Sequence, residues 1–478
     1  MVKHRSAGRK ASSILPSSYR DPSGSVFAHE GAIYRVIYEP YRTCYERLMG
    51  SGLYASLTEK GLLLNHQELG KIAIPLPEPL RAGTHAGRVF RVIRPTTIPF
   101  ISYPYEWSFS QLKDAALTTL DIALESLEFG MVLKDASPFN TQFFLGKPVH
   151  VDTLSFEFYQ EGEPWVAYRQ FCEGFLGPLV LAATADARLL RLSATHLNGI
   201  PLDLVSRLLP LTAKLKSGIL IHILAHAKSQ KRYADRPLPT LKRGLRKIEF
   251  QALLMNLKKT VLGLKPGTSE SFWDSYYTRF RYSANAQGSK ERIVRTLLEK
   301  IKGRVVWDLG ANLGVYSRIA AEHAALVVAM DMDVVSIDSM YRTCRQQGEK
   351  RILPLVMDLT NPSPSIGWNQ EERLSLLDRG PADSVLALAL LHHLAISSNV
   401  PMFMIAKFLK RICRSSLIVE FVSPGDPQVT RMLERRKDGV PDYTRESFEQ
   451  AFQKYFTLRS VASVRDTRRA IYHFSTKA

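Results

Sequence analysis

Residues 304–320 read RVVWDLGANLGVYSRIA. The apolar run Val305–Trp307 ends in Asp308, and the small residues that follow include Gly310 and Gly314. A strand, a glycine-containing turn and a helix in this order are typical of the first unit of a doubly wound α/β sheet. Such a turn allows a ligand to approach bare backbone at the carboxyl end of the strand.

Strands and helices alternate on both sides of this segment. The predicted strands are 304–308, 326–331, 352–357, 383–389 and 416–422, and the predicted helices are 289–302, 315–324, 333–347, 399–412 and 444–455. Two further strands, 457–464 and 468–475, have the pattern of a closing hairpin. Five parallel strands and a hairpin predict a seven-stranded α/β sheet.

Acidic residues end three of the predicted strands: Asp308 the first, Asp331 the second and Asp358 the third. Because the carboxyl ends of parallel strands share one edge, we expect these side chains at one ligand site. A carboxylate after the second strand suits two ribose hydroxyls, and one after the third suits the exocyclic amine of adenine. Gly310 and Gly314 would let an amino-acid group lie against the backbone.

The segment Asp308–Gly314 resembles motif I of the class I, Rossmann-like S-adenosylmethionine-dependent methyltransferases. Asp331, the step Asp358-Leu359 and the pair His392-His393 resemble the later motifs of this family, in the family's order. The resemblance covers residues 270–478 and implies S-adenosyl-L-methionine as the cofactor. The cofactor-binding residues that it implies are Asp308, Gly310, Asn312, Gly314, Asp331, Asp358 and Leu359.

Two other readings of this segment stay open. A dinucleotide site would carry G-x-G-x-x-G, but Gly310 and Gly314 lack the closely spaced first pair of that fingerprint. A strand, turn and helix without any ligand is the other alternative. Within the methyltransferase reading, His393 or His392 is the candidate base for a hydroxyl or neutral amine acceptor, although either histidine could instead only cap the strand.

Composition limits the class of protein. The chain has 478 residues, a formal net charge of +19 and four widely spaced cysteines without a CxxC pair, which favours a reducing compartment over a disulfide framework or a zinc site. No apolar run approaches the length of a membrane span, and the N-terminus lacks the apolar core of a secretory signal. We therefore expect a cytoplasmic protein, with no metal in the methyltransferase site.

The N-terminal region contains a second motif. Asp135 and Asn140 have the D-x-x-x-x-N spacing, and an apolar stretch then leads to Asp152. This segment resembles the catalytic loop and metal-binding strand of kinase-like phosphotransferases, in which Asn140 and Asp152 would hold magnesium. An active kinase, a kinase-like remnant that binds substrate, and an unrelated fold with a chance match all remain open.

The predicted organisation is a disordered basic tail at 1–25, an α+β domain at 26–227, a basic linker at 228–248 and the methyltransferase domain at 249–478. The function expected is S-adenosylmethionine-dependent methylation of an unknown acceptor, with a glycan or small metabolite favoured. RNA is the alternative acceptor, because the tail and the linker are strongly basic. A non-catalytic scaffold with relic sites is the alternative from another class.

Overall fold

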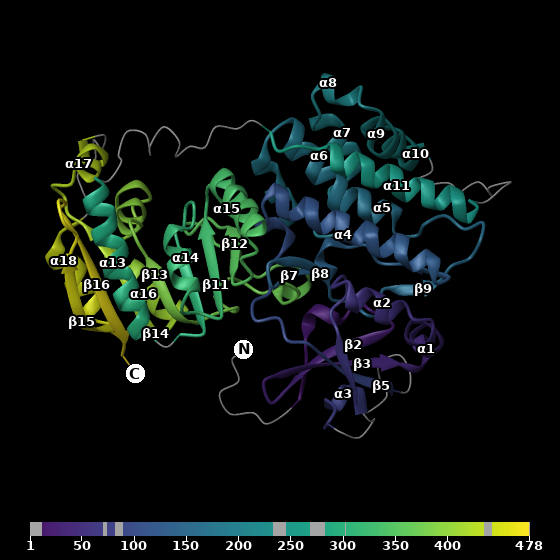
Figure 1. Cartoon of the computed structure of the whole chain (residues 1–478), viewed down its shortest axis with the longest axis horizontal. Helices are drawn as coiled ribbons and strands as arrows, with labels where there is room; N and C mark the ends of the chain where they lie inside the picture. Colours follow the sequence, from purple (N-terminus) through teal and green to yellow (C-terminus); the bar gives the residue numbers. More distant parts are fainter. Residues whose placement is uncertain are drawn as a thin grey trace. The chain divides into compact units, whose positions relative to one another are not determined.

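The computed structural model describes residues 12–69, 74–81, 89–232, 245–267, 283–301, 303–434 and 442–477. The chain forms two compact units, which we call unit 1 and unit 2 (Figure 1). Unit 1 comprises Met1–Ser269 and Ser365–Arg373, and unit 2 comprises Glu270–Pro364 and Leu374–Ala478. Within the described ranges, no helix is both long enough and apolar enough to cross a membrane.

Unit 2 is built on one seven-stranded sheet, in the order β12-β11-β10-β13-β14-β16-β15. The first five of these strands are parallel, and β16 runs antiparallel to both β14 and β15. The strands are β10 (Val305–Leu309), β11 (Leu326–Asp331), β12 (Ile352–Val356), β13 (Ala382–Ala387), β14 (Cys413–Val422), β15 (Phe456–Ser463) and β16 (Arg469–Thr476). The predicted seven-stranded Rossmann-like sheet is confirmed.

Helices cover the faces of this sheet, because apolar side chains of its strands point alternately to one face and the other. Val306 and Ile418 belong to a buried cluster that also contains apolar side chains of three helices on the same face, whereas Trp307, next along its strand, points to the other face. The helices of unit 2 are α13 (Ala284–Lys300), α14 (Val315–Ala321), α15 (Val334–Gln347), α16 (Met402–Ile412), α17 (Pro427–Glu434) and α18 (Arg445–Gln453). Helices α13, α14 and α15 contribute to the cluster, and α16 contacts α18.

One helix of unit 2 is not predicted from the sequence. Helix α17 follows Pro424, Gly425 and Asp426, a run that has the composition of a turn. The side chain of Asp426 accepts the backbone N–H of Gln428 at 3.0 Å, so this run acts as the start of the helix.

Unit 1 begins with a five-stranded antiparallel sheet in the order β1-β2-β3-β5-β4. Its strands are β1 (Ser13–Ile14), β2 (Gly24–His29), β3 (Ala32–Tyr38), β4 (His66–Leu69) and β5 (Val89–Pro95), and the helices α1 (Arg42–Gly50), α2 (Leu53–Glu59) and α3 (Glu78–Arg81) accompany it. The prediction of disorder over 1–25 is wrong for residues 12–25, because β1 pairs with β2. Residues 1–11 lie outside the described ranges.

Two short strand pairs follow the long helix α4 (Phe109–Glu128) in unit 1. Strand β6 (Met131–Leu133) pairs with β9 (Phe156–Phe158), and β7 (Thr141–Phe144) pairs with β8 (Lys147–His150). The Asp135–Asn140 segment lies between β6 and β7, and Asp152 lies between β8 and β9. The kinase-like segment is therefore a loop, a hairpin and a second loop framed by paired strands.

The rest of unit 1 is helical. It comprises α5 (Tyr168–Phe171), α6 (Gly177–Thr184), α7 (Leu202–Leu208), α8 (Leu211–Lys214), α9 (Ser217–Ile219), α10 (His226–Arg232) and α11 (Lys247–Gly263), with π-helical turns at Cys172–Leu176 and Leu220–Ala225 and 3₁₀ turns at Pro16–Ser18, Glu39–Tyr41, Pro104–Glu106, Pro138–Asn140 and Ala187–Ala194. Helix α11, expected to open the C-terminal domain, instead packs on α4 within unit 1. The Nζ of Lys113 on α4 donates to the carbonyl oxygens of Leu262 and Leu264 at 2.9 and 2.7 Å.

The predicted linker is only partly within the described ranges. Residues 228–232 belong to α10, residues 233–244 lie outside the described ranges, and Leu245 bridges to Gly162 in unit 1. In addition, the segment Ser365–Arg373 belongs to unit 1, although unit 2 supplies the chain on both sides of it. The guanidinium of Arg20 holds the carboxylate of Glu372 in this segment through two contacts of 2.8 and 3.1 Å.

Candidate functional site

The glycine turn after β10 is fixed by the neighbouring strand. The backbone N–H groups of Gly310 and Ala311 both donate to the carbonyl oxygen of Met330, at 2.8 and 3.0 Å. Gly310 and Gly314 have φ angles of 74° and 76°, in the left-handed region that favours glycine. A Cβ at Gly314 would lie 2.8 Å from the Sδ of Met340, so the turn also needs glycine for space.

Asp308 lies beneath this turn and is 2% exposed. Its Oδ2 accepts the hydroxyl of Ser317, on α14, at 2.6 Å. Burial raises the pKa of the Asp308 carboxyl to about 6, although the bond from Ser317 opposes this rise. Asp308 therefore joins β10 to the helix that follows the turn, and it is the deepest of the three predicted carboxylates.

Asp331 ends β11 and connects the turn to the next strand. One carboxylate oxygen accepts the N–H of Asn312 at 2.8 Å, and the other accepts the N–H of Asp333 at 2.9 Å. Burial raises the pKa of Asp331, and these backbone donors lower it. Met332, the next residue, is 59% exposed, so an apolar side chain stands beside a nearly buried carboxylate. Reasoning from the sequence did not identify Met332.

Asp358 and Leu359 follow β12 and are both partly exposed. The Oδ1 of Asp358 accepts the N–H and the hydroxyl of Thr360, at 2.9 and 2.6 Å. Strand register places Asp308 level with Ala329, two residues before Asp331, and places Asp331 level with Val356, two residues before Asp358. The three carboxylates thus follow one another along the carboxyl edge of three neighbouring strands.

His392 and His393 follow β13 and meet the side chain of Gln428 from α17. The Nε2 of Gln428 lies 2.7 Å from the Nε2 of His392 and 3.2 Å from the Nε2 of His393. The Oε1 of Gln428 lies 3.1 Å from the Nη2 of Arg469, which can only donate. The amide oxygen therefore faces Arg469, the amide N–H group faces the imidazoles, and each imidazole accepts through Nε2.

Both histidines are held in the neutral form. Burial, followed by the charge of Arg469, lowers the pKa of His393 to about 4. Burial also lowers the pKa of His392 well below its usual value, and the side chain is fully buried. Because Gln428 donates to the Nε2 that a base would use, the arrangement disfavours proton abstraction at that atom.

A buried ionic cluster adjoins these histidines. The Nζ of Lys290, on α13, lies 2.7 Å from the carboxylate of Glu420, on β14, and both side chains are at most 3% exposed. Arg469 binds Asp426 at 2.8 Å and lies 3.8 Å from Glu420. Lys290 also lies over the ring of Tyr316, 4.6 Å from its centroid, in the first turn of α14.

The sequence pointed to only part of this cluster. Glu420 lies in the predicted strand 416–422, but its position in the sequence does not indicate its partner. Lys290, Asp426 and Arg469 were missed, because their partners are distant in sequence; Lys290 and Glu420 are separated by 130 positions. The available signal for Arg469 was its place at the start of the last predicted strand.

The kinase-like residues in unit 1 are engaged by other protein groups. Asp152 lies 2.5 Å from the guanidinium of Arg35, on β3, and accepts the hydroxyl of Ser155 at 2.7 Å. Burial alone would raise the pKa of Asp152, but the charge of Arg35 holds it below its usual value. Asn140 donates to the same Ser155 at 3.4 Å, so Asn140 and Asp152 meet at one hydroxyl group.

Asp135 accepts the N–H of Ser137 and the side-chain amide of Gln170, at 3.0 and 2.8 Å. Across the described part of the chain, no group of three or more His, Cys, Asp or Glu side chains is placed to hold a metal ion. The guanidinium of Arg35 supplies the positive charge beside Asp152. The kinase-like reading of unit 1 stays a prediction.

A relative with nearly the same length decides the family. The chain is 33% identical to nodulation protein NoeA of Rhizobium meliloti (strain 1021) over 466 residues, which cover 96% of the chain and 95% of that protein. The chain belongs to the NoeA family. No protein-family model matches this NoeA-family chain.

Unit 2 of this NoeA-family protein has the class I methyltransferase fold, identified by its strand order and antiparallel last strand. Solved structures with some likeness include magnesium protoporphyrin IX methyltransferase from Synechocystis PCC 6803 with bound SAH, at 14% identity and a TM-score of 0.31 over 43% of this chain and 92% of that one. N-methyltransferase NodS from Bradyrhizobium japonicum WM9 is 11% identical, with a TM-score of 0.31 over 41% of this chain and 99% of that one. With such low scores, the strand order alone carries the fold assignment.

Proposed function

We propose that unit 2 is an S-adenosylmethionine-dependent methyltransferase. The observation that supports this best is the row of Asp308, Asp331 and Asp358 along one sheet edge, next to a turn in which Gly310 and Gly314 have positive φ angles. A sheet of this kind binds its ligand at the carboxyl ends of its strands. The TM-scores of the solved methyltransferases add nothing to this argument.

The residues at this edge fit the parts of the cofactor. The positive φ angles at Gly310 and Gly314 leave the backbone open to the amino-acid end. Asp331 keeps acceptor capacity beyond the backbone donors of Asn312 and Asp333 and suits the ribose hydroxyls. Asp358 suits the adenine amine, and the exposed Met332 offers an apolar surface to the adenine ring.

A dinucleotide fits less well. Gly310 and Gly314 are four residues apart, whereas the dinucleotide fingerprint G-x-G-x-x-G has its second glycine two residues after the first. Asp308, Asn312 and Leu359 complete the proposed cofactor site: Asp308 positions the turn, Asn312 shapes it, and Leu359 borders Asp358.

Bound S-adenosylmethionine would supply a methyl group on a positively charged sulfur. The protein's part is then to align an acceptor atom with that methyl group and to exclude water. The buried cluster of Lys290, Glu420, Arg469 and Gln428, with His392 and His393, borders the loop after β13 and is well suited to shaping the acceptor side. Gln428 fixes the tautomers of His392 and His393 there, because it donates to the Nε2 atom of each ring.

The state of the histidines bears on the acceptor. An imidazole with a pKa of about 4 is a weak base, so a hydroxyl group would gain little help from His393. A neutral amine needs no base before it attacks. We therefore favour a glycan or small metabolite that presents a neutral amine; the name of the relative, a nodulation protein, is compatible with a glycan.

Labelled methyl transfer tests this function. Full-length protein and S-adenosylmethionine with a labelled methyl group are incubated with extract, and products are identified by mass spectrometry. A labelled glycan or metabolite that is absent with Asp331→Asn supports the proposal. If only RNA is labelled, and labelling falls steeply with salt, the acceptor is RNA instead. Cofactor binding without any labelled product would favour the scaffold.

A further inference from the structure

One end of unit 1 carries large apolar side chains that face solvent. Leu215 is 84% exposed and Leu211 is 80% exposed, more than any other large apolar residue of the described ranges. Leu208, Leu220 and Ile221 are 42%, 52% and 49% exposed. We call these five residues the leucine surface; they lie on α7, on α8, just after α8, and on the π-helical turn Leu220–Ala225.

The core of unit 1 does not need these side chains. The same short helices bury Ala213, Ile219 and Ile223, which are at most 3% exposed and point inward. Helix α7 contacts both the π-helical turn and α10, and α8 lies at the same end of unit 1 (Figure 1). An outward apolar face over a satisfied inner face marks an interaction surface.

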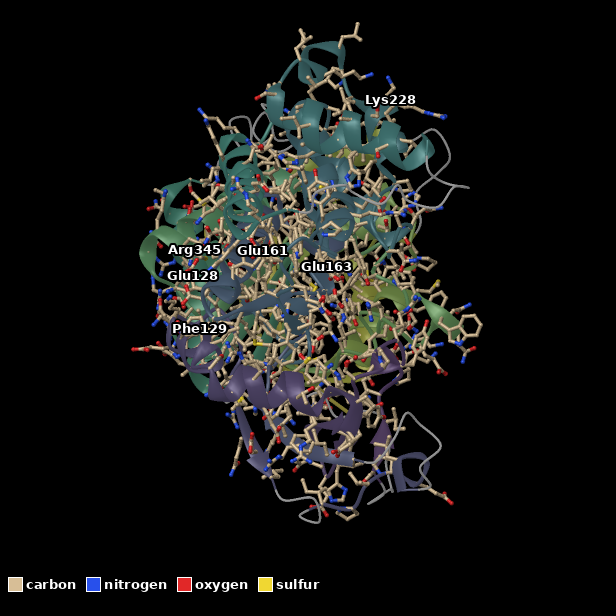
Figure 2. The ribbon with its side chains drawn as sticks, turned by 90° about the vertical axis from the view of Figure 1, so that its right-hand side faces the viewer. Glu128, Phe129, Glu161, Glu163, Lys228 and Arg345 are labelled. Carbon is tan, nitrogen blue, oxygen red and sulfur yellow. The ribbon has the colours of Figure 1, made fainter. Side chains whose placement is uncertain are left out.

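Basic residues outnumber acidic ones around the leucine surface. Helix α7 through Ser229 contains Arg207, Lys214, Lys216 and Lys228 against one acid, Asp203, which pairs with Arg207 at 3.9 Å. Leu215 lies between Lys214 and Lys216 in the sequence, and Lys216 and Lys228 are exposed. Figure 2 shows Lys228 at this end, away from the labelled acidic residues Glu161, Glu163 and Glu128.

We propose that the leucine surface docks unit 1 on an anionic lipid surface. Exposed leucines would enter the boundary between headgroups and acyl chains, while flexible lysine side chains reach back to the phosphates. Lys214, Lys216 and Lys228 supply the charge complementarity, because the one acid of this stretch, Asp203, already pairs with Arg207. This role goes beyond methyl transfer and does not depend on it.

Vesicle co-sedimentation of the full-length chain tests this surface. We expect the protein to sediment with vesicles of phosphatidylcholine and phosphatidylglycerol, to remain in solution with phosphatidylcholine alone, and to be released by high salt. The double variant Leu211→Ser/Leu215→Ser and the double variant Lys214→Glu/Lys216→Glu should each weaken partitioning about tenfold or more. Leu145→Ser, which removes a leucine that is 55% exposed on the β7–β8 turn, should partition like the wild type.

Other outcomes would overturn the proposal. The first is a wild-type chain that does not sediment with phosphatidylglycerol vesicles. The second is a Leu211→Ser/Leu215→Ser chain that binds them as the wild type does. The third is a Leu145→Ser chain that loses as much vesicle binding as the double variant. Sedimentation velocity without lipid would detect a second copy as the occupant: a dimer that the Leu211→Ser/Leu215→Ser change dissolves, without vesicle binding by the wild type, also overturns it. Circular dichroism shows whether each variant is folded.

Discussion

The carboxyl group of Asp308 is buried and accepts the hydroxyl of Ser317. Its pKa of about 6 exceeds the ordinary 3.8, so the folded protein keeps a proton that the unfolded chain has released at the same pH. The resulting stabilisation is present below about pH 4 and is lost as the pH rises through 6.

The variant Asp308→Asn should remove this pH dependence, because an amide does not ionise there. Between pH 4 and pH 7 the free energy of unfolding of the wild type should fall relative to Asp308→Asn, by up to about 3 kcal/mol. Urea unfolding followed by circular dichroism measures the difference. Ser317→Ala should move the inflection to higher pH, and a wild type that gains stability relative to Asp308→Asn over this range would contradict the account.

His392 and His393 lead to a prediction about protonation. Both imidazoles should stay neutral, with the proton on Nδ1, from pH 8 down to about pH 5, because burial opposes their charge and Gln428 donates to each Nε2. Nitrogen shifts of labelled histidine, assigned with His392→Gln and His393→Gln, report both properties. A titration of either ring near pH 6.5 would contradict this prediction.

The glycine turn acts at the scale of an element, because it joins β10 to α14 and lies against α15. Gly314→Ala should destabilise unit 2 by about 2–4 kcal/mol, since alanine disfavours a positive φ and its Cβ would meet Met340. Gly348→Ala is the matched control: it has a φ of 67° with no atom within 4 Å of the new Cβ, and should cost about 1 kcal/mol. Urea unfolding compares the two, and equal losses would show that the close approach is unimportant.

Helix α13 allows a buried ion pair to be compared with an exposed one. Lys290→Met leaves the fully buried Glu420 without its nearest cation and should cost about 3–5 kcal/mol. Arg295→Met, on the same helix, breaks a pair with Glu322 in which both side chains are at least 40% exposed, and should cost less than about 1 kcal/mol. Thermal and urea unfolding measure both, and a small loss in Lys290→Met would remove the cluster from the account of unit 2.

Elements with strong periodicity were predictable from the sequence, and contacts between distant elements were not. The ends of the strands around Asp308, Asp331 and Asp358 are predictable within one residue, and parallel pairing then places the carboxylates at one edge. Gln428 escaped prediction because its helix begins in a run of turn-forming residues. Lys290 and Glu420 meet only after α13 packs beside the finished sheet.

At the scale of the whole molecule, sequence order was a poor guide to the units. The sequence of helix α11 has an amphipathic pattern that would suit a helix of either unit. No residue within or near α11 indicates that it packs on α4. Likewise, Glu372 lies in the middle of the methyltransferase sequence, yet it pairs with Arg20 in unit 1. Such assignments depend on long-range packing, whereas the glycine turn is encoded within a few residues.

The most direct test of the central claim needs a carboxylate that is matched to Asp331 but distant from the site. Asp383 serves, because its Oδ2 accepts the backbone N–H groups of Arg304 and Val305, at 3.0 and 3.1 Å, where β10 begins, while its Oδ1 pairs with Arg414 at 2.8 Å. Both aspartates therefore bind backbone donors of unit 2, at opposite edges of the same sheet. Asparagine at either position keeps an oxygen acceptor and removes the charge.

The deciding measurement is isothermal titration of the full-length chain with S-adenosylmethionine. It compares the wild type with Asp331→Asn and Asp383→Asn. The wild type and Asp383→Asn should bind with equal affinity, and Asp331→Asn should bind at least about tenfold more weakly, a loss of about 1.4 kcal/mol. No binding by the wild type, or equal binding by Asp331→Asn, would contradict the assignment of this sheet edge to the cofactor.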